Sequence, residues 1–202
     1  MGGLPVPRLF ILRTLALLTA AIGLLTAMPY LQASLSDNDF YGLRTDLPVP
    51  ALAGAEAPQT GLNVVFFGYR HCGDVCPKQL GNLKRLQAMM AEDPVQFVFV
   101  TLDPERDQQA ELSHFNAAMG PQFVAVRPQT ARAAQALALA YGDVAYKTPD
   151  GRDNYTVQHA GHLYVVSAMN RKQLTYVTDN LDLERVHHDL RLLLARQKEE
   201  NH

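Results

Sequence analysis

The sequence predicts an α/β fold in which one mixed β-sheet is covered by helices on both faces. From about residue 62 onward, short apolar runs of strand length alternate with longer segments of helical periodicity. The last two strand-like runs are separated only by a short turn at 169–172, which indicates an antiparallel hairpin in the sheet. With 202 residues, 48% of them hydrophobic, the chain can form one domain with a full core and one further segment.

The further segment is at the N-terminus. Residues 1–13 are a basic segment with Arg8 and Arg13, and residues 14–33 are uncharged and rich in leucine. This pattern predicts either a single transmembrane anchor or a cleaved signal peptide, and we favour the anchor because a small-x-small cleavage site is poor here. The basic residues before the apolar run predict a single-pass inner-membrane protein whose domain faces the periplasm or the intermembrane space.

Residues 34–61 predict a linker, because three prolines and three glycines interrupt them and they show little periodicity. A globular domain is then expected at 62–196, followed by a tail at 197–202. Such a linker would allow the domain to reach a partner in the same membrane.

Within the domain, runs of branched and aromatic residues indicate strands, and apolar residues at helical spacing indicate helices. Pro104 ends the second strand and Gly142 ends the third helix. The polar stretch 145–156 is expected to form an excursion or a hairpin. The expected elements are strand 62–69, helix 77–92, strand 96–102, helix 109–119, strand 123–126, helix 130–141, strands 163–167 and 174–177, and a last helix that Asp179, Asn180 or Asp182 caps.

Cys72 and Cys76, the only cysteines, lie on the turn between the first strand and the first helix. The order of elements, with a reactive turn after an early strand, fits a thioredoxin-like sandwich. A helix N-terminus favours negative charge, so this position predicts lowered pKa values for both thiols. A structural disulfide across so short a loop would contribute only about 2 kcal/mol. A redox-active dithiol, or a pair of ligands for a thiophilic metal ion, is therefore favoured over a structural bridge.

The segment 158–162, Gln-His-Ala-Gly-His, favours the metal. Thioredoxin-type enzymes have two residues between their cysteines and a cis-proline opposite them, whereas this chain has three residues and no proline after Pro149. An imidazole that faces two thiolates suits copper, above all Cu(I), or zinc. His159 is the expected nitrogen ligand and His162 is the alternative. His71 adjoins Cys72, so its side chain is expected to point away from the site.

Residues 66–77, Phe-Phe-Gly-Tyr-Arg-His-Cys-Gly-Asp-Val-Cys-Pro, closely resemble the signature of the Sco/SenC family, copper proteins that help to assemble the dinuclear copper centre of cytochrome c oxidase. Three further matches lie at 102–107, 140–142 and 155–159, and the resemblance runs from about residue 62 to 194. It implies a thioredoxin-like fold, a membrane anchor, and copper, as Cu(I) or Cu(II), bound by the residues that match by position: Cys72, Cys76 and His159.

The sequence departs from the family pattern at two positions near these residues. Gly73 stands where a proline is usual, and Gln158 stands where an acidic residue usually precedes the histidine. An aspartate at 158 would orient the imidazole. Asp103 is expected either to support the cysteine turn or to cap the end of a strand.

The expected function is that of a membrane-tethered copper chaperone that delivers copper to the copper centre of a membrane-embedded cytochrome c oxidase subunit. The alternative is a thiol-disulfide oxidoreductase in which Cys72 and Cys76 reduce cysteines of that subunit or of another copper or thiol protein. A peroxidase of peroxiredoxin type is disfavoured because Tyr69 stands where a threonine is usual. A net charge of -2 and scattered basic residues argue against nucleic acid as a partner.

Overall fold

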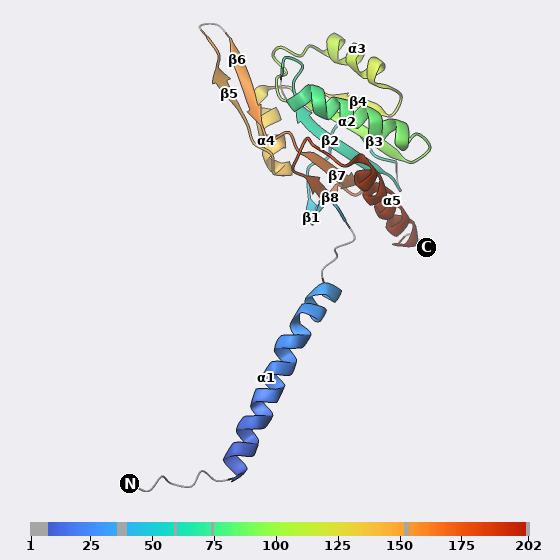
Figure 1. Ribbon diagram of the computed structural model, residues 1–202. Coiled ribbons are helices and arrows are strands. Elements are labelled where there is room, and N and C mark those ends of the chain that lie inside the picture. Colours follow the sequence, from blue (N-terminus) through green and yellow to red (C-terminus); the bar gives the residue numbers. More distant parts are fainter. Residues whose placement is uncertain (1–7, 36–39, 59, 74, 152–153, 201–202) are drawn as a thin grey trace. The chain divides into compact units, whose positions relative to one another are not determined.

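The structure is a computed structural model that describes residues 8–35, 40–58, 60–73, 75–151 and 154–200. The chain divides into two compact units, Met1–Asp39 and Phe40–His202. The first unit contains the helix α1 (Arg8–Leu35), drawn in blue in Figure 1. No helix among the described residues is both long and apolar enough to cross a membrane. The anchor expected at 14–33 therefore stays a prediction.

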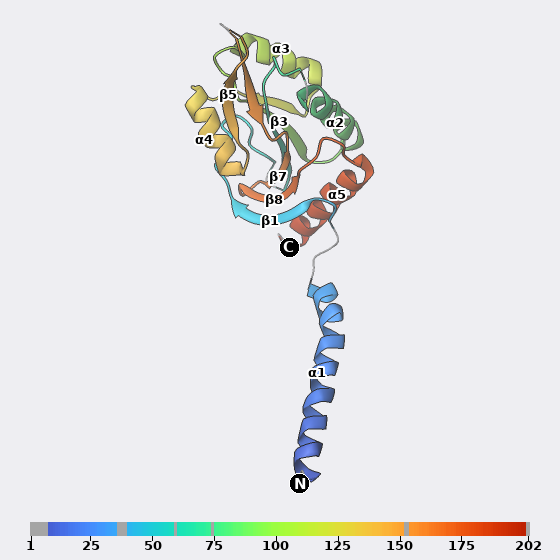
Figure 2. The same ribbon diagram turned by 60° about the vertical axis from the view of Figure 1, so that its left-hand side comes forward.

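The second unit is built on a six-stranded mixed sheet with the order β1-β8-β7-β2-β3-β4 (Figures 1 and 2). The strands β2, β3 and β4 are parallel, whereas β7 is antiparallel to β2, and β8 pairs antiparallel with both β7 and β1. The strands are β1 (Leu43–Pro48), β2 (Leu62–Gly68), β3 (Val95–Thr101), β4 (Phe123–Val126), β7 (Leu163–Ser167) and β8 (Arg171–Tyr176). The predicted mixed sheet is confirmed.

Helices cover both faces of this sheet. Alternate residues of β2 point to opposite faces, so that Val64 and Phe66 belong to one hydrophobic cluster while Val65 and Phe67 belong to the other. The helices α2 (Val75–Met89), α3 (Gln109–Met119) and α5 (Leu183–Glu200) contribute to the first cluster, and α4 (Ala131–Tyr141) contributes to the second. Every residue of β2 is buried, which explains why this strand reads as a continuous apolar run.

The expected hairpin at 145–156 is present and longer than predicted. The strands β5 (Ala145–Pro149) and β6 (Tyr155–His159) pair antiparallel and form a separate two-stranded sheet, with Ala145 opposite His159. Figure 1 shows this hairpin beside α4. His159 is therefore the last residue of a strand rather than part of the loop before β7.

The expected linker at 34–61 is wrong for residues 40–58, which belong to the globular unit. The strand β1 lies at the edge of the sheet and is mostly exposed, so it lacks the apolar alternation that identifies an inner strand. After it, Val49, Leu52 and Ala55 are buried in the same cluster as α4. Of the remaining expected linker, residues 36–39 and 59 lie outside the described residues.

Asp189 of α5 holds the start of the segment 40–58 in place. Its buried carboxylate accepts hydrogen bonds from the backbone N–H groups of Tyr41 (3.0 Å) and Gly42 (2.9 Å) and from the hydroxyl of Tyr176 (2.9 Å). Three donors, two from the segment just before β1 and one from the end of β8, thus converge on one buried charge and compensate for its lost hydration.

We predict that Asp189→Ala lowers the free energy of unfolding by about 3 kcal/mol, because buried donors are left without an acceptor. Urea unfolding followed by circular dichroism measures this change. Asp46→Ala is the control, since Asp46 is an exposed carboxylate of β1 that pairs with Arg171 at the surface. Equal effects of the two substitutions would contradict the role of Asp189.

Candidate metal centre

The two cysteines lie where β2 ends and α2 begins. Cys76 is the second residue of α2 and is buried, whereas Cys72 lies in the preceding turn and is partly exposed. The backbone N–H of Cys72 donates to the carbonyl of Tyr69 at 3.2 Å and closes this turn. Gly68 makes room for the second sulfur, because a Cβ atom at this position would lie only 3.0 Å from Sγ of Cys76.

His159 reaches the same place from the end of β6. Its Nε2 atom lies 3.3 Å from Sγ of Cys76 and 3.9 Å from Sγ of Cys72. The three atoms lie within 4.8 Å of one another, and they form the cluster of potential metal ligands among the described residues. The rings of Phe66 and Tyr69 contact the imidazole edge-on, with centroids at 5.9 and 6.1 Å. The expected convergence of His159 with the cysteine pair is confirmed.

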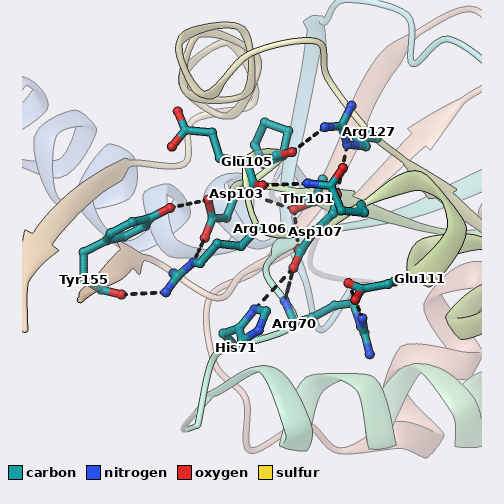
Figure 3. A network of polar contacts seen from close by, with 12 residues as sticks. Arg70, His71, Thr101, Asp103, Glu105, Arg106, Asp107, Glu111, Arg127 and Tyr155 are labelled. Carbon is teal, nitrogen blue, oxygen red and sulfur yellow. Dashed lines mark hydrogen bonds and ion pairs between the residues drawn. The ribbon is translucent and has the colours of Figure 1, made fainter. Parts of the chain in front are cut away.

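The other two histidines considered from the sequence lie outside this cluster. His71 points to the buried carboxylate of Asp107, with Nδ1 at 3.6 Å from Oδ1, as Figure 3 shows. Its side chain thus points away from the site, as expected. His162 instead contacts Tyr164, whose hydroxyl lies 3.4 Å from its Nδ1 atom. His159 is therefore the histidine that the fold brings to the sulfurs.

Burial sets the protonation of this site. It raises the pKa of the Cys76 thiol, and the neighbouring Cys72 raises it further. The lowering expected from the helix N-terminus is therefore wrong for Cys76, because loss of hydration outweighs the helix dipole. Burial also lowers the pKa of His159, partly offset by the carboxylate of Asp143, and so favours the neutral imidazole that can donate a lone pair to a metal ion.

The loop between β3 and α3 holds the cysteine turn. The buried carboxylate of Asp107 accepts hydrogen bonds from the backbone N–H of Arg70 (3.1 Å) and from the hydroxyl of Thr101 (2.6 Å). Arg70 lies two residues after the end of β2 and two before Cys72, and Thr101 is the last residue of β3. This carboxylate therefore connects the start of the cysteine turn to the end of β3 (Figure 3).

The same loop also holds the hairpin that carries His159. The hydroxyl of Tyr155 donates to Oδ1 of Asp103 at 2.8 Å, and Nη1 of Arg106 donates to the backbone carbonyl of Tyr155 at 3.0 Å. The guanidinium of Arg106 also pairs with Asp103 and lies 3.9 Å from the centroid of the Tyr155 ring (Figure 3). The side chain of Asp103 therefore supports the hairpin on the histidine side of the site, and not the cysteine turn as expected.

Gln79 and Asp143 fix the chain just after His159, and the sequence analysis did not identify either residue. Nε2 of the fully buried Gln79 donates to the carbonyl of Gly161 at 2.7 Å, and Oδ1 of Asp143 accepts from the N–H of Ala160 at 2.9 Å. Gln79 could have been found from its helical spacing to the buried Cys76 and Leu83 of α2. Asp143 carried no comparable signal, because an acidic residue after a helix-ending glycine is usually exposed.

The donor atoms fit one soft metal ion. Metal bonds of about 2.0–2.3 Å to nitrogen and sulfur place the donors of a trigonal site roughly 3.5–4 Å apart, close to the separations of Nε2 from the two sulfurs given above. Two thiolates and one imidazole are ligands that copper and zinc accept. A cleft lined by Tyr69, Cys72, Gly73, Val75 and residues 156–159 opens beside them. An incoming ligand can therefore approach the site from this cleft.

The fold and the donor set together define a class of protein, a thioredoxin-like domain whose two-cysteine turn is completed by an imidazole. The family model described as SCO1/SenC matches residues 52–195. This match covers more than half of the chain, so the chain belongs to the SCO1/SenC family.

Individual relatives agree with this assignment. The solution structure of the apo Sco1 protein from Thermus thermophilus is 32% identical with a TM-score of 0.63, and the match covers 76% of this chain and 96% of that chain. The protein "SCO2 homolog, mitochondrial" from Homo sapiens is 31% identical over 109 residues, which cover 52% of this chain and 41% of the human protein. The present chain thus spans about two fifths of the length of the first curated relatives that it matches. A copper-bound structure of ScoI from Bradyrhizobium japonicum, 22% identical with a TM-score of 0.59 over 75% of this chain and 99% of that chain, shares the fold.

We predict that Arg106→Gln loosens the hairpin that carries His159. The loss of charge-assisted contacts to Asp103 and Tyr155 should speed amide hydrogen exchange in β5 and β6 about tenfold, while exchange in β2 and β3 stays unchanged. Arg132→Gln on the exposed face of α4 is the control. Unchanged exchange in the hairpin of the Arg106 variant would show that this guanidinium does not hold it.

Proposed function

We propose that this protein binds one copper ion through Cys72, Cys76 and His159 and delivers it to the copper centre of cytochrome c oxidase. The observation that carries the proposal is the position of Nε2 of His159, which faces both sulfurs at 3.3 and 3.9 Å. Soft thiolates favour Cu(I), and a neutral imidazole completes a three-coordinate set. The copper-bound ScoI structure shows that the same fold holds copper in another protein.

Release by ligand exchange is supported by the unequal burial of the two sulfurs. Cys76 is buried next to Gly68 in the hydrophobic core, while Cys72 is partly exposed at the cleft. A thiolate or imidazole of the acceptor protein can therefore add to the copper ion beside Cys72, after which the bond to Cys72 breaks first. Copper is the cargo in this transfer, and its oxidation state does not change.

The apolar segment 14–33 supports a tethered form of this carrier. A single-pass anchor in the inner membrane would place the domain in the periplasm or intermembrane space, near a membrane-embedded oxidase subunit. Tethering raises the effective concentration of the carrier at a target in the same membrane. The human relative is described as mitochondrial, which agrees with the second of these compartments.

We predict that the reduced full chain binds about one equivalent of Cu(I), as expected for a single three-ligand site. Cys72→Ala, Cys76→Ala and His159→Ala should each abolish tight, stoichiometric binding in competition with a chromophoric Cu(I) chelator. His162→Ala is the matched control and should bind as wild type does, because its ring contacts Tyr164 instead. Stoichiometric tight copper in the His159 variant would refute the ligand set.

A second candidate function, thiol-disulfide exchange, is favoured by the proximity of the two cysteines in one ligand cluster, with Cys72 partly exposed. In this reaction the dithiol transfers two electrons and two protons to a disulfide of the target. Cys72 forms a mixed disulfide with the target, and Cys76 then displaces the reduced target and leaves a Cys72–Cys76 disulfide.

The two functions differ in their need for the imidazole. We predict that His159→Ala retains reduction of a peptide disulfide within about threefold of wild type, because the exchange needs only the sulfurs. Its copper transfer to an acceptor peptide with cysteine and histidine ligands should be lost. Gel-shift alkylation and copper analysis of the separated acceptor measure the two activities. If the variant loses disulfide reduction and keeps copper transfer, the assignment of His159 to copper is wrong.

A further inference from the structure

Asp143 is a buried carboxylate next to the histidine side of the site. It follows Gly142, which ends α4 in a left-handed conformation with φ 88°. Asp143 itself is completely buried. The pairing of β5 with β6 places Ala145 opposite His159, so that Asp143, two residues earlier, lies beside the chain that leaves His159. A buried carboxylate is costly unless hydrogen bonds compensate for its lost hydration.

Hydrogen bonds compensate only one oxygen of this carboxylate for its lost hydration. Oδ1 accepts hydrogen bonds from the N–H groups of Val144 (2.8 Å) and Ala160 (2.9 Å). Within the described residues, Oδ2 is buried and has no hydrogen-bond partner, and the same is true of Nδ1 of His159. The buried region thus contains an acceptor and a ring nitrogen that both lack a partner.

The chemistry of the imidazole makes these two atoms complementary. Neutral imidazole carries a proton on one nitrogen and a lone pair on the other. When Nε2 uses its lone pair for a metal ion, the proton must be on Nδ1, which then becomes a buried donor that needs an acceptor. The charge of Asp143 already acts on this ring, since it raises the pKa of His159 against the effect of burial.

We propose that Asp143 is a positioning residue for His159: when Nε2 binds copper, the Asp143 carboxylate accepts the hydrogen bond that Nδ1–H donates. This inference rests on the proposed copper site. The hydrogen bond fixes the tautomer and the direction of the ring, and it increases the basicity of Nε2. Gln158, which directly precedes His159, does not supply this acceptor, because successive side chains of a strand point to opposite faces and that of Gln158 is exposed.

Tyr164 is the competing partner for the carboxylate. Burial raises the pKa of its hydroxyl, and both the charge of Asp143 and a side-chain contact with that carboxylate raise it further, so the two groups lie close together. The hydroxyl is also 3.4 Å from Nδ1 of His162. If Oδ2 accepted a hydrogen bond from Tyr164 rather than from His159, removal of the Tyr164 hydroxyl would weaken copper binding as much as removal of the Asp143 charge.

The test compares Asp143→Asn with Asp143→Ala in the full reduced chain. The asparagine keeps an oxygen for the N–H of Ala160 but removes the charge, whereas alanine removes both. We expect Asp143→Asn to weaken Cu(I) binding about 10–100-fold in chelator competition. In nitrogen-15 NMR of the Cu(I)-loaded protein, the His159 Nδ1–H proton should move upfield and exchange faster with water. Asp143→Ala should weaken binding at least as much.

Two controls separate positioning from general stability. Asp189→Asn changes a buried carboxylate that also accepts backbone N–H groups but contacts the segment before β1 and the end of β8, so it should lower stability and leave copper affinity and the Nδ1–H signal unchanged. Tyr164→Phe should likewise leave both unchanged. A loss of copper affinity in Tyr164→Phe equal to that in Asp143→Asn would overturn the inference.

The remaining outcomes are equally decisive. Wild-type affinity and an unchanged Nδ1–H signal in Asp143→Asn, with loss only in Asp143→Ala, would reduce Asp143 to a loop-fixing residue and overturn the inference while copper binding stands. No copper binding by wild type would overturn the proposed function, and this inference with it.

Discussion

The site depends on a single constraint, which is that a loop between β3 and α3 fastens two distant parts of the chain at once. Cys72 and His159 are 87 residues apart, and neither the cysteine turn nor the β5–β6 hairpin belongs to the central sheet. Asp107 binds the first part through the N–H of Arg70, and Asp103 with Arg106 binds the second through Tyr155. The separation of sulfur and nitrogen therefore follows from one short segment with two buried carboxylates.

Burial of these contacts explains why polar groups can perform this task. An exposed ion pair contributes little because water competes for both charges. Asp103 and Asp107 are completely buried, and each accepts several hydrogen bonds in a region of low dielectric constant, where an unmet donor would be costly. The same physics acts on the three clustered residues, since burial raises the pKa of Cys76 and lowers that of His159. A metal ion must displace the thiol proton, but it finds the imidazole already in its binding form.

The sequence predicted the sheet and the three clustered residues because both have strong local signals. The strand β2 is buried on both faces and so reads as one apolar run, and Cys72 and Cys76 are the only cysteines. The strand β1 could not be predicted in this way, because an exposed edge strand that ends in a proline resembles a linker. The raised pKa of Cys76 was missed for a related reason: the helix N-terminus is visible in the sequence, whereas the depth of burial beneath Gly68 depends on the whole fold. Asp143 and Arg106 act through contacts with residues far along the chain, which no local pattern encodes.

The unequal environments of the three clustered residues support the proposed transfer of a metal ion rather than its storage. On the inner side, Cys76 is held by α2 and the core, and His159 is held by the hairpin and by the contacts of Gln79 and Asp143 just beyond it. On the outer side, Cys72 is partly exposed and lies in a turn that borders an open cleft. A metal ion bound by two fixed donors and one accessible donor keeps a defined position while a new ligand replaces the accessible one. A bond from the ion to a new ligand can form before the bond to the accessible donor breaks. The ion is therefore never without protein ligands during transfer, and tight binding remains compatible with release.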